Sequence, residues 1–162
     1  MNVFGSGSKA QIKTMHGDLQ KIFNLAIKRS NVDFGVHQGG RTVEQQQEYF
    51  DNKKSKLNPR RFSTVEELAK VAKHIVISGH PEFGKSRAGD IHISEKYKTK
   101  SLTWDEVHLA YVAGVIDSCA KELHEKCQIS HIIRWGADWD RDGIIALDHK
   151  LKDFPHHELI SI

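Results

Sequence analysis

Two short segments, far apart in this chain, carry residue types that bind metal ions. Ser78-Gly-His80 is followed by Ala88-Gly-Asp90, and Asp153-Phe-Pro-His156 comes near the other end. Two histidines and a carboxylate leave the fourth position of a zinc ion open for water, as in catalytic sites, whereas structural zinc sites are closed by four ligands. We therefore predict that His80, Asp90 and His156 bind one catalytic zinc ion, which would make the protein a hydrolase.

A zinc hydrolase also needs a carboxylate that does not bind the metal and that carries a proton from water to the leaving group. Asp153 lies three residues before His156 and is the predicted base. Because side chains alternate along a strand, Glu158 shares a face with His156, whereas His157 points to the opposite face. Glu158 could orient a ligand and is the second candidate for the base.

The stretch Asp138-Trp-Asp140-Arg-Asp142-Gly143 has the alternating carboxylates and the glycine of the first half of an EF-hand calcium loop. The glutamate expected later in such a loop is replaced by His149, with Asp148 beside it. The pattern therefore fits either a weakened calcium site or a simple Asp-rich turn.

Five motifs follow one another in an order that resembles a known enzyme family. They are Gln38-Gly-Gly-Arg41-Thr, Ser78-x-His80, Ala88-x-Asp90, Arg134-Trp-Gly-Ala-Asp138-Trp and Asp153-x-x-His156-His-Glu158-Leu. In this order they resemble the VanY-type D-alanyl-D-alanine carboxypeptidase family of zinc peptidases, and most closely the L-alanyl-D-glutamate peptidases that tailed phages use as endolysins. The resemblance covers nearly the whole chain. It implies an α+β fold of the D-Ala-D-Ala carboxypeptidase/hedgehog-like type, with a small, mainly antiparallel sheet packed with helices.

The resemblance also implies roles for single residues. Arg41 matches the Arg-Thr motif of the family and would hold a substrate carboxylate or stabilise an oxyanion, although a structural salt bridge at a helix start is the alternative. Ser78 would contact substrate or support the site through a hydrogen bond. Since related phage peptidases carry a similar Ala-Asp-Trp loop and some are regulated by calcium, Asp138, Asp140 and Asp142 would bind a regulatory Ca²⁺ ion.

The predicted reaction is hydrolysis of the L-alanyl-D-glutamate bond in peptidoglycan stem peptides. The sequence departs from the family pattern Ser-x-His-x-x-Gly-x-Ala-x-Asp, because the segment from His80 to Asp90 is three residues longer. His92 or His74 therefore stays open as a substitute ligand. D-alanyl-D-alanine carboxypeptidase or dipeptidase action uses the same machinery and stays open as the alternative reaction.

Size and charge fit one catalytic domain over residues 1–162, without a separate wall-binding domain. The chain has 162 residues, a net charge of +3 and two cysteines, Cys119 and Cys127, which we expect to be buried thiols. Its basic residues are dispersed, so a nucleic-acid partner is not expected, and a non-catalytic metal- or nucleic-acid-binding module is the competing class. No stretch resembles a signal peptide or a membrane span. We expect a monomer that accumulates in the cytoplasm of an infected host and reaches the cell wall with a holin or on breakage.

The elements that must position these residues can be read from periodicity and caps. One helix face is predicted from Ile12, Met15, Leu19, Ile22, Phe23 and Ala26. Capping boxes at Thr42/Gln45, Ser63/Glu66 and Thr103/Glu106 would begin three further helices, the last with an apolar face at Val107, Tyr111, Val115, Cys119 and Leu123. Strands are predicted at residues 33–37, 75–77, 90–93, 132–135 and 157–160, with the second and third of them paired.

Overall fold

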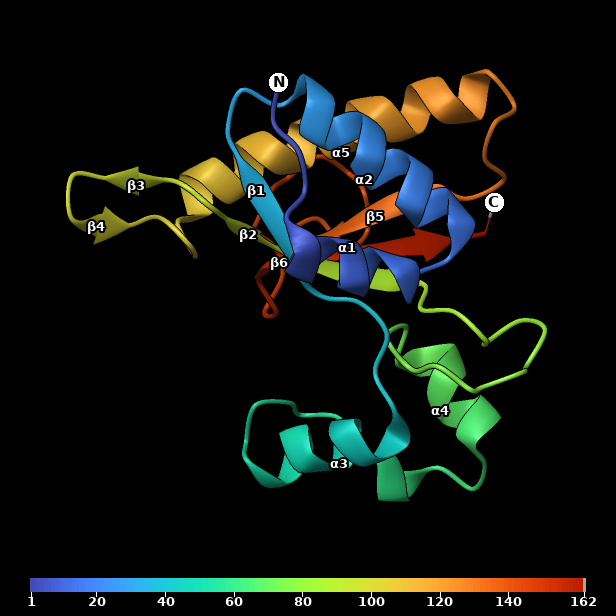
Figure 1. The fold of residues 1–162 in the computed structure, drawn as a ribbon. Coiled ribbons are helices and arrows are strands. Elements are labelled where there is room, and N and C mark those ends of the chain that lie inside the picture. Colours follow the sequence, from blue (N-terminus) through green and yellow to red (C-terminus); the bar gives the residue numbers. More distant parts are fainter. Residues whose placement is uncertain (162) are drawn as a thin grey trace.

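The computed structural model describes residues 1–161, and for residues 96 and 97 it describes the backbone only. The helices are α1 (Ser6–Lys13), α2 (Gly17–Arg29), α3 (Val43–Asp51), the 3-10 turn η1 (Pro59–Arg61), α4 (Val65–Val71) and α5 (Glu106–Glu125). The strands are β1 (Phe34–Gln38), β2 (Ala88–Ile93), β3 (Lys96–Tyr97), β4 (Lys100–Ser101), β5 (Ile132–Gly136) and β6 (Asp153–Ile160). An antiparallel sheet of order β1-β2-β6-β5 and a β3–β4 hairpin confirm the α+β class (Figure 1).

Helices α2 and α5 cover one face of the four-stranded sheet and build the main core with it (Figure 1). All six apolar residues of the first predicted helix face are buried. They do not form one helix, however: Ile12 belongs to α1, Met15 lies in the junction, and the other four belong to α2. There Met15 bridges to Ser86, and the His16 amide donates to the Ser86 carbonyl at 2.8 Å. Such pairing to another segment ends the helical hydrogen-bond ladder.

Helix α5 begins at Glu106 with Asp105 as its N-cap, two residues later than the predicted cap Thr103. The predicted apolar face is wrong at its start, because Val107 and Tyr111 are 77% and 45% exposed. The buried face instead contains Leu109, Val112, Ala113, Ile116, Cys119, Ala120 and Leu123. Cys127 is exposed just beyond the helix, which corrects the prediction that both thiols are buried.

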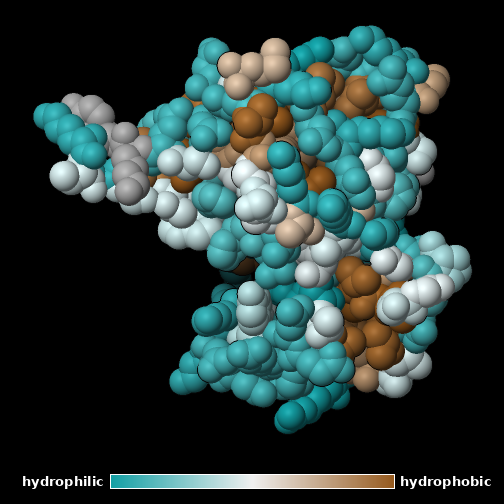
Figure 2. Space-filling view, viewed as in Figure 1, coloured by the Kyte–Doolittle hydropathy of each residue, from teal (hydrophilic) through white to brown (hydrophobic). Residues whose placement is uncertain are grey.

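A second layer, formed by residues 39–87 with α3 and α4, lies against the other side of the sheet (Figure 1). It has a small core of its own, made of Leu68, Ala69, Ile75 and Phe83. The capping box of Thr42 and Gln45 is confirmed, whereas α4 is capped by Thr64, one residue later than predicted. Hydrophobic side chains gather at the surface around α4 (Figure 2).

The predicted strand at residues 75–77 is reduced to one parallel bridge between Ile75 and Arg41. Its predicted partner strand exists as β2, but β2 pairs with β1 and β6 instead. The last strand, β6, begins at Asp153, four residues earlier than predicted, and so carries both Asp153 and His156. Within residues 1–161, no helix combines the length and the apolar composition needed to cross a membrane.

Candidate metal centre

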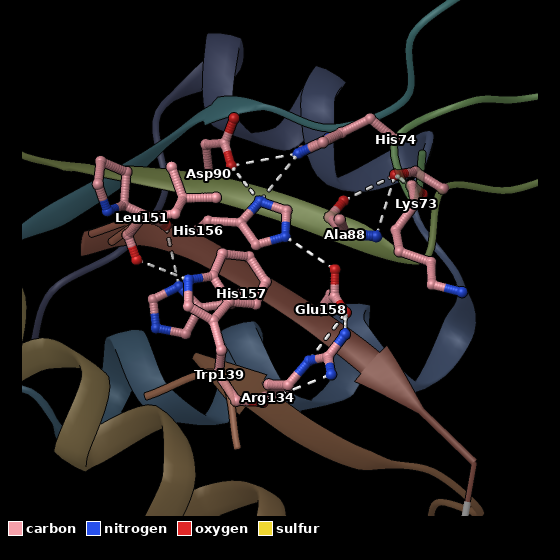
Figure 3. Close-up of polar contacts among 12 residues, drawn as sticks. Lys73, His74, Ala88, Asp90, Arg134, Trp139, Leu151, His156, His157 and Glu158 are labelled. Carbon is pink, nitrogen blue, oxygen red and sulfur yellow. Dashed lines mark hydrogen bonds and ion pairs between the residues drawn. The ribbon is translucent and has the colours of Figure 1, made fainter. Parts of the chain in front are cut away.

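Three side chains converge on the sheet face opposite α2 and α5. Asp90 extends from β2, His156 from β6, and His74 reaches the sheet from the layer of residues 39–87. Asp90 Oδ1 lies 3.2 Å from His74 Nε2 and 3.0 Å from His156 Nδ1, and the two ring nitrogens are 3.3 Å apart (Figure 3). Asp90 and His156 are directly opposed in the β2–β6 register, so the sheet itself brings these two together.

The outer nitrogens of both rings are held by oxygen acceptors. His74 Nδ1 lies 2.7 Å from the Gly39 carbonyl, and His156 Nε2 lies 3.0 Å from Glu158 Oε2. Because a carbonyl and a carboxylate only accept, each outer nitrogen carries the N–H. In the neutral rings, the lone pairs of His74 Nε2 and His156 Nδ1 then point toward Asp90. This hydrogen bonding from the far side of the ring is typical of histidines that bind metals.

The charges around His156 favour a cation. Burial alone would lower its pKa, but hydrogen bonds to Asp90 and Glu158 raise the pKa of His156 to about 10. Burial likewise opposes ionisation of Asp90, yet the two histidines hold the pKa of Asp90 well below its usual range. A place that favours an extra positive charge this strongly also suits a divalent ion. The donor set therefore fits a mononuclear metal such as zinc.

The predicted grouping of His80 with Asp90 and His156 is corrected by the structure, because His74 occupies that place. His80 Nδ1 instead accepts the backbone N–H groups of Glu82 and Phe83 at 3.1 and 3.0 Å. Its ring therefore fastens a tight turn. No spacing rule on the sequence distinguishes a turn cap from a ligand.

His92, the other substitute considered, lies on the same strand as Asp90, two residues further on. Its ring lies beside Gly35 and edge-on to His37, with ring centroids 6.3 Å apart, and it does not join the cluster. His157 points to the opposite face, as predicted, where its ring meets Phe23. Burial lowers the pKa of His157 to about 4, so this core imidazole is neutral.

Glu158, predicted to orient a ligand, contacts His156 and is itself held by Arg134. Arg134 Nε donates to Glu158 Oε1 at 3.0 Å, and a second guanidinium nitrogen contacts the same oxygen (Figure 3). Burial favours the protonated carboxyl, but His156 and Arg134 keep the pKa of Glu158 below its usual value. Arg134 belongs to the Arg-Trp motif quoted above, but no pattern in the sequence indicates that it supports Glu158.

Asp153 lies at the start of β6, three residues before His156, and makes no side-chain hydrogen bond in the described part of the chain. Burial, with the charge of Asp90 adding to it, raises the pKa of Asp153. Gly136 on β5 permits this placement, because a Cβ there would lie 2.4 Å from the Asp153 carbonyl oxygen. Asp153 is thus a half-buried carboxylate whose oxygens remain available, and its pKa is influenced by Asp90 and His156.

Arg41 lies where the second layer meets the sheet. Its guanidinium contacts Gln46 Oε1 at 2.7 Å and lies 4.4 Å from the centre of the Tyr49 ring, while its buried Nε has no partner in residues 1–161. Burial lowers the pKa of Arg41, although the charges of Asp90 and Asp153 oppose this. Within the same residues no carboxylate lies within 4.0 Å, so the salt-bridge alternative is not found.

Two further predicted groups lie outside the cluster. Ser78 is exposed in the turn before His80 and has no hydrogen bond to the cluster among residues 1–161. The three aspartates of the EF-hand-like stretch do not form one group. Asp138 and Asp140 gather with His149, and Asp140 and Asp142 gather with Asp148, so that Asp140 is shared.

The fold and the cluster define an α+β protein with a His/Asp donor set suited to one metal ion. A family model described as phage L-alanyl-D-glutamate peptidase matches residues 2–160, and the chain therefore belongs to this family. Its relatives include the L-alanyl-D-glutamate peptidase of Escherichia phage T5, at 27% identity over 141 residues, covering 86% of this chain and 83% of the relative. The crystal structure of the Serratia marcescens L-Ala D-Glu endopeptidase ChiX shares the fold, with a TM-score of 0.62, 21% identity and coverage of 98% and 91%. The predicted resemblance to the phage L-alanyl-D-glutamate peptidases is confirmed.

Proposed function

We propose that this protein is a zinc-dependent endolysin that hydrolyses the L-alanyl-D-glutamate bond of peptidoglycan stem peptides. The observation that carries the proposal is the arrangement of His74 and His156, whose outer nitrogens are fixed by acceptors and whose inner nitrogens face Asp90. Family membership supplies the substrate class. His74, Asp90 and His156 would hold the ion, and a zinc ion supplies Lewis acidity and a water of lowered pKa at such a site.

The remaining chemistry falls to residues of this chain. Asp153 would accept a proton from the attacking water and deliver it to the leaving amine, a role suited to a carboxylate with a raised pKa. Arg41 would hold a substrate carboxylate or the developing oxyanion through its unpartnered Nε. Glu158 would hold the ring of His156 in place, and Arg134 would keep Glu158 ionised. Ser78 would contact the substrate at the edge of the site.

We also propose that the Asp-rich stretch binds a regulatory Ca²⁺ ion, as the resemblance implied. Asp140 belongs to both acidic groups, and a buried oxygen of Asp138 has no partner in residues 1–161. If calcium orders this stretch, it acts on the chain that leads to Asp153 and His156. The variant Asp140→Ala/Asp142→Ala should lose any dependence of activity on calcium. A calcium titration that looks the same in wild type and variant would refute this role.

The deciding experiment is mass spectrometry of the products released from purified Gram-negative peptidoglycan, with and without a chelator. We expect fragments with a new N-terminal D-glutamate that disappear with the chelator and return with zinc. Release of D-alanine instead would assign the protein to the carboxypeptidase alternative. No products, even with zinc and calcium added, would favour the non-catalytic module. Size-exclusion chromatography would test the predicted monomer, and a lysis assay with a co-expressed holin would test its route to the wall.

A further inference from the structure

A second group of potential metal ligands lies at the opposite end of the sheet. His16 is the N-cap of α2, Asp18 stands in the first turn of that helix, and His131 immediately precedes β5. Donor atoms of these three side chains lie within 4.8 Å of one another. The register separates this group from the proposed catalytic centre, because β5 begins opposite Ile160 and ends opposite Asp153.

Buried Asp18 is the centre of this group. Its Oδ2 accepts the His131 ring N–H at 2.8 Å and the backbone N–H groups of Ser130 and His131 at 3.0 and 3.3 Å. His16 Nδ1 accepts the Asp18 backbone N–H at 3.1 Å, so its lone pair lies on the side of Asp18. The rings of His16 and His131 meet edge to face, with centroids 4.8 Å apart.

Capping of α2 accounts for His16, and anchoring of the turn at Ser130 accounts for the carboxylate, but neither requires two imidazoles to meet at that carboxylate. The backbone N–H groups already hold Asp18 to residues more than a hundred positions away in sequence. Two imidazoles and a carboxylate, supplied by two segments that the fold holds together, are instead the donor set of divalent transition metals. Tight structural sites for calcium or magnesium would use oxygen ligands, which two of these three residues lack.

We propose that His16, Asp18 and His131 bind a second divalent transition metal ion, with zinc as the best-suited cation. On binding, the neutral His131 ring takes the tautomer whose N–H is on Nε2, so that Nδ1 offers its lone pair to the ion in place of the hydrogen bond to Asp18. His16 exchanges its hydrogen bond from the Asp18 amide for a bond to the metal. The ion then links the start of α2 to the start of β5. Because the group lies at the far end of the sheet from Asp153, the ion takes no part in the proposed peptidase reaction.

The test measures the number of zinc ions bound per protein in a variant that lacks the proposed catalytic site. The background is His74→Ala/His156→Ala, to which His131→Asn is added. Asparagine keeps an N–H donor for Asp18 but removes the imidazole. The matched control is His108→Asn, because His108 also pairs with an aspartate, Asp105, at 2.6 Å, but has no second imidazole in its group.

We expect His131→Asn to lose one zinc equivalent relative to its parent and to weaken zinc binding at least about tenfold, whereas His108→Asn changes neither. Added zinc should raise the melting temperature of the background but not of its His131→Asn variant. Equal zinc counts in the background and in His131→Asn would overturn the proposal.

A second substitution guards against misfolding. His16→Ala leaves the Asp18–His131 pair intact and should also lose the zinc equivalent. If the His74→Ala/His156→Ala background does not fold, the same substitutions are compared in the wild-type protein. There His131→Asn and His16→Ala should each lose one zinc equivalent relative to wild type. All these readouts are metal counts and melting temperatures, so they do not depend on the proposed peptidase activity.

Discussion

The indole of Trp139 stacks against the imidazole of His156, with ring centroids 5.5 Å apart and planes inclined by 33°. Trp139 Nε1 donates to the Leu151 carbonyl at 2.9 Å, and the Arg134 guanidinium lies 5.4 Å from the Trp139 ring centre (Figure 3). Arg134 in turn holds Glu158, which holds His156. Trp139, Arg134, Glu158 and His156 thus form a closed ring of contacts. Through Trp139, the Asp-rich stretch contacts a candidate metal ligand directly.

This contact predicts that Trp139→Ala loosens His156. Metal affinity should fall about 10- to 100-fold, the size expected when support of a ligand is lost. Trp139→Phe keeps an aromatic face and should retain most of the affinity. Zinc titration against a competing chelator measures both. Equal affinities for wild type and Trp139→Ala would mean that the stacking supports nothing at the centre.

The exchange of His80 for His74 predicts opposite results for two alanine variants. His74→Ala removes a proposed ligand, so bound zinc and peptidase activity should fall together, the activity by at least about 100-fold. His80→Ala removes only a turn cap, with a cost in stability of about 1 kcal/mol. Bound zinc is measured after dialysis, and peptidase activity is measured as the rate of hydrolysis, for both variants. Loss of zinc in His80→Ala alone would restore the grouping predicted from sequence.

Substitution of the proposed base should separate metal binding from turnover. Asp153→Asn keeps the shape of the side chain but does not accept the proton, so kcat should fall about 10²- to 10⁴-fold with zinc still bound. The acidic limb of the wild-type rate profile, which reports protonation of the base, should be absent from the residual activity of Asp153→Asn. Zinc loss in Asp153→Asn would instead make Asp153 a ligand.

Stability of the metal-free protein should depend on pH through His156. Its pKa rises from 6.5 in the unfolded chain to about 10 in the folded protein. The folded state therefore binds the proton more tightly. The resulting stabilisation is complete below pH 6.5 and is lost as the pH rises toward 10.

Urea unfolding of the chelated protein at about pH 6 and about pH 9 measures this loss, which is at most about 1.4 kcal/mol per pH unit. His156→Gln has no such proton, so its stability should change less over the same interval. If wild type and His156→Gln lose the same stability between these two values, the interaction of His156 with Asp90 and Glu158 is weaker than described.

Gly136 should tolerate no side chain. A Cβ at this position would lie 2.4 Å from the Asp153 carbonyl oxygen and 3.0 Å from the Cβ of His156. Gly136→Ala must therefore displace both residues, with a loss of about 1–3 kcal/mol and a marked fall in activity. The control is Gly114→Ala in α5, where no atom lies within 4 Å and a gain of up to about 1 kcal/mol is expected. Thermal unfolding with activity assays would test the pair, and a fully active Gly136→Ala protein would contradict it.

The sequence by itself determined the α+β class, the family, and the side of β6 on which His156 and Glu158 lie. These follow from local rules, because motif order and the alternation of side chains along a strand do not depend on distant packing. The capping box at Thr42 is likewise a contact between near neighbours and was predicted correctly. The six apolar residues of α1, α2 and their junction were all buried as expected.

Only the tertiary structure decided which histidine joins Asp90 and His156. His74 and His80 flank the same short segment, and either could have reached the sheet. In the structure His74 joins the cluster, because the bridge between Arg41 and Ile75 holds His74 beside β2. His80 instead caps a turn. The buried face of α5 was decided in the same way, since apolar residues occur around its first turns and packing selects among them. Arg134, Trp139 and His156 come from separate segments and contact one another only in the folded protein, so no local sequence pattern predicts these contacts.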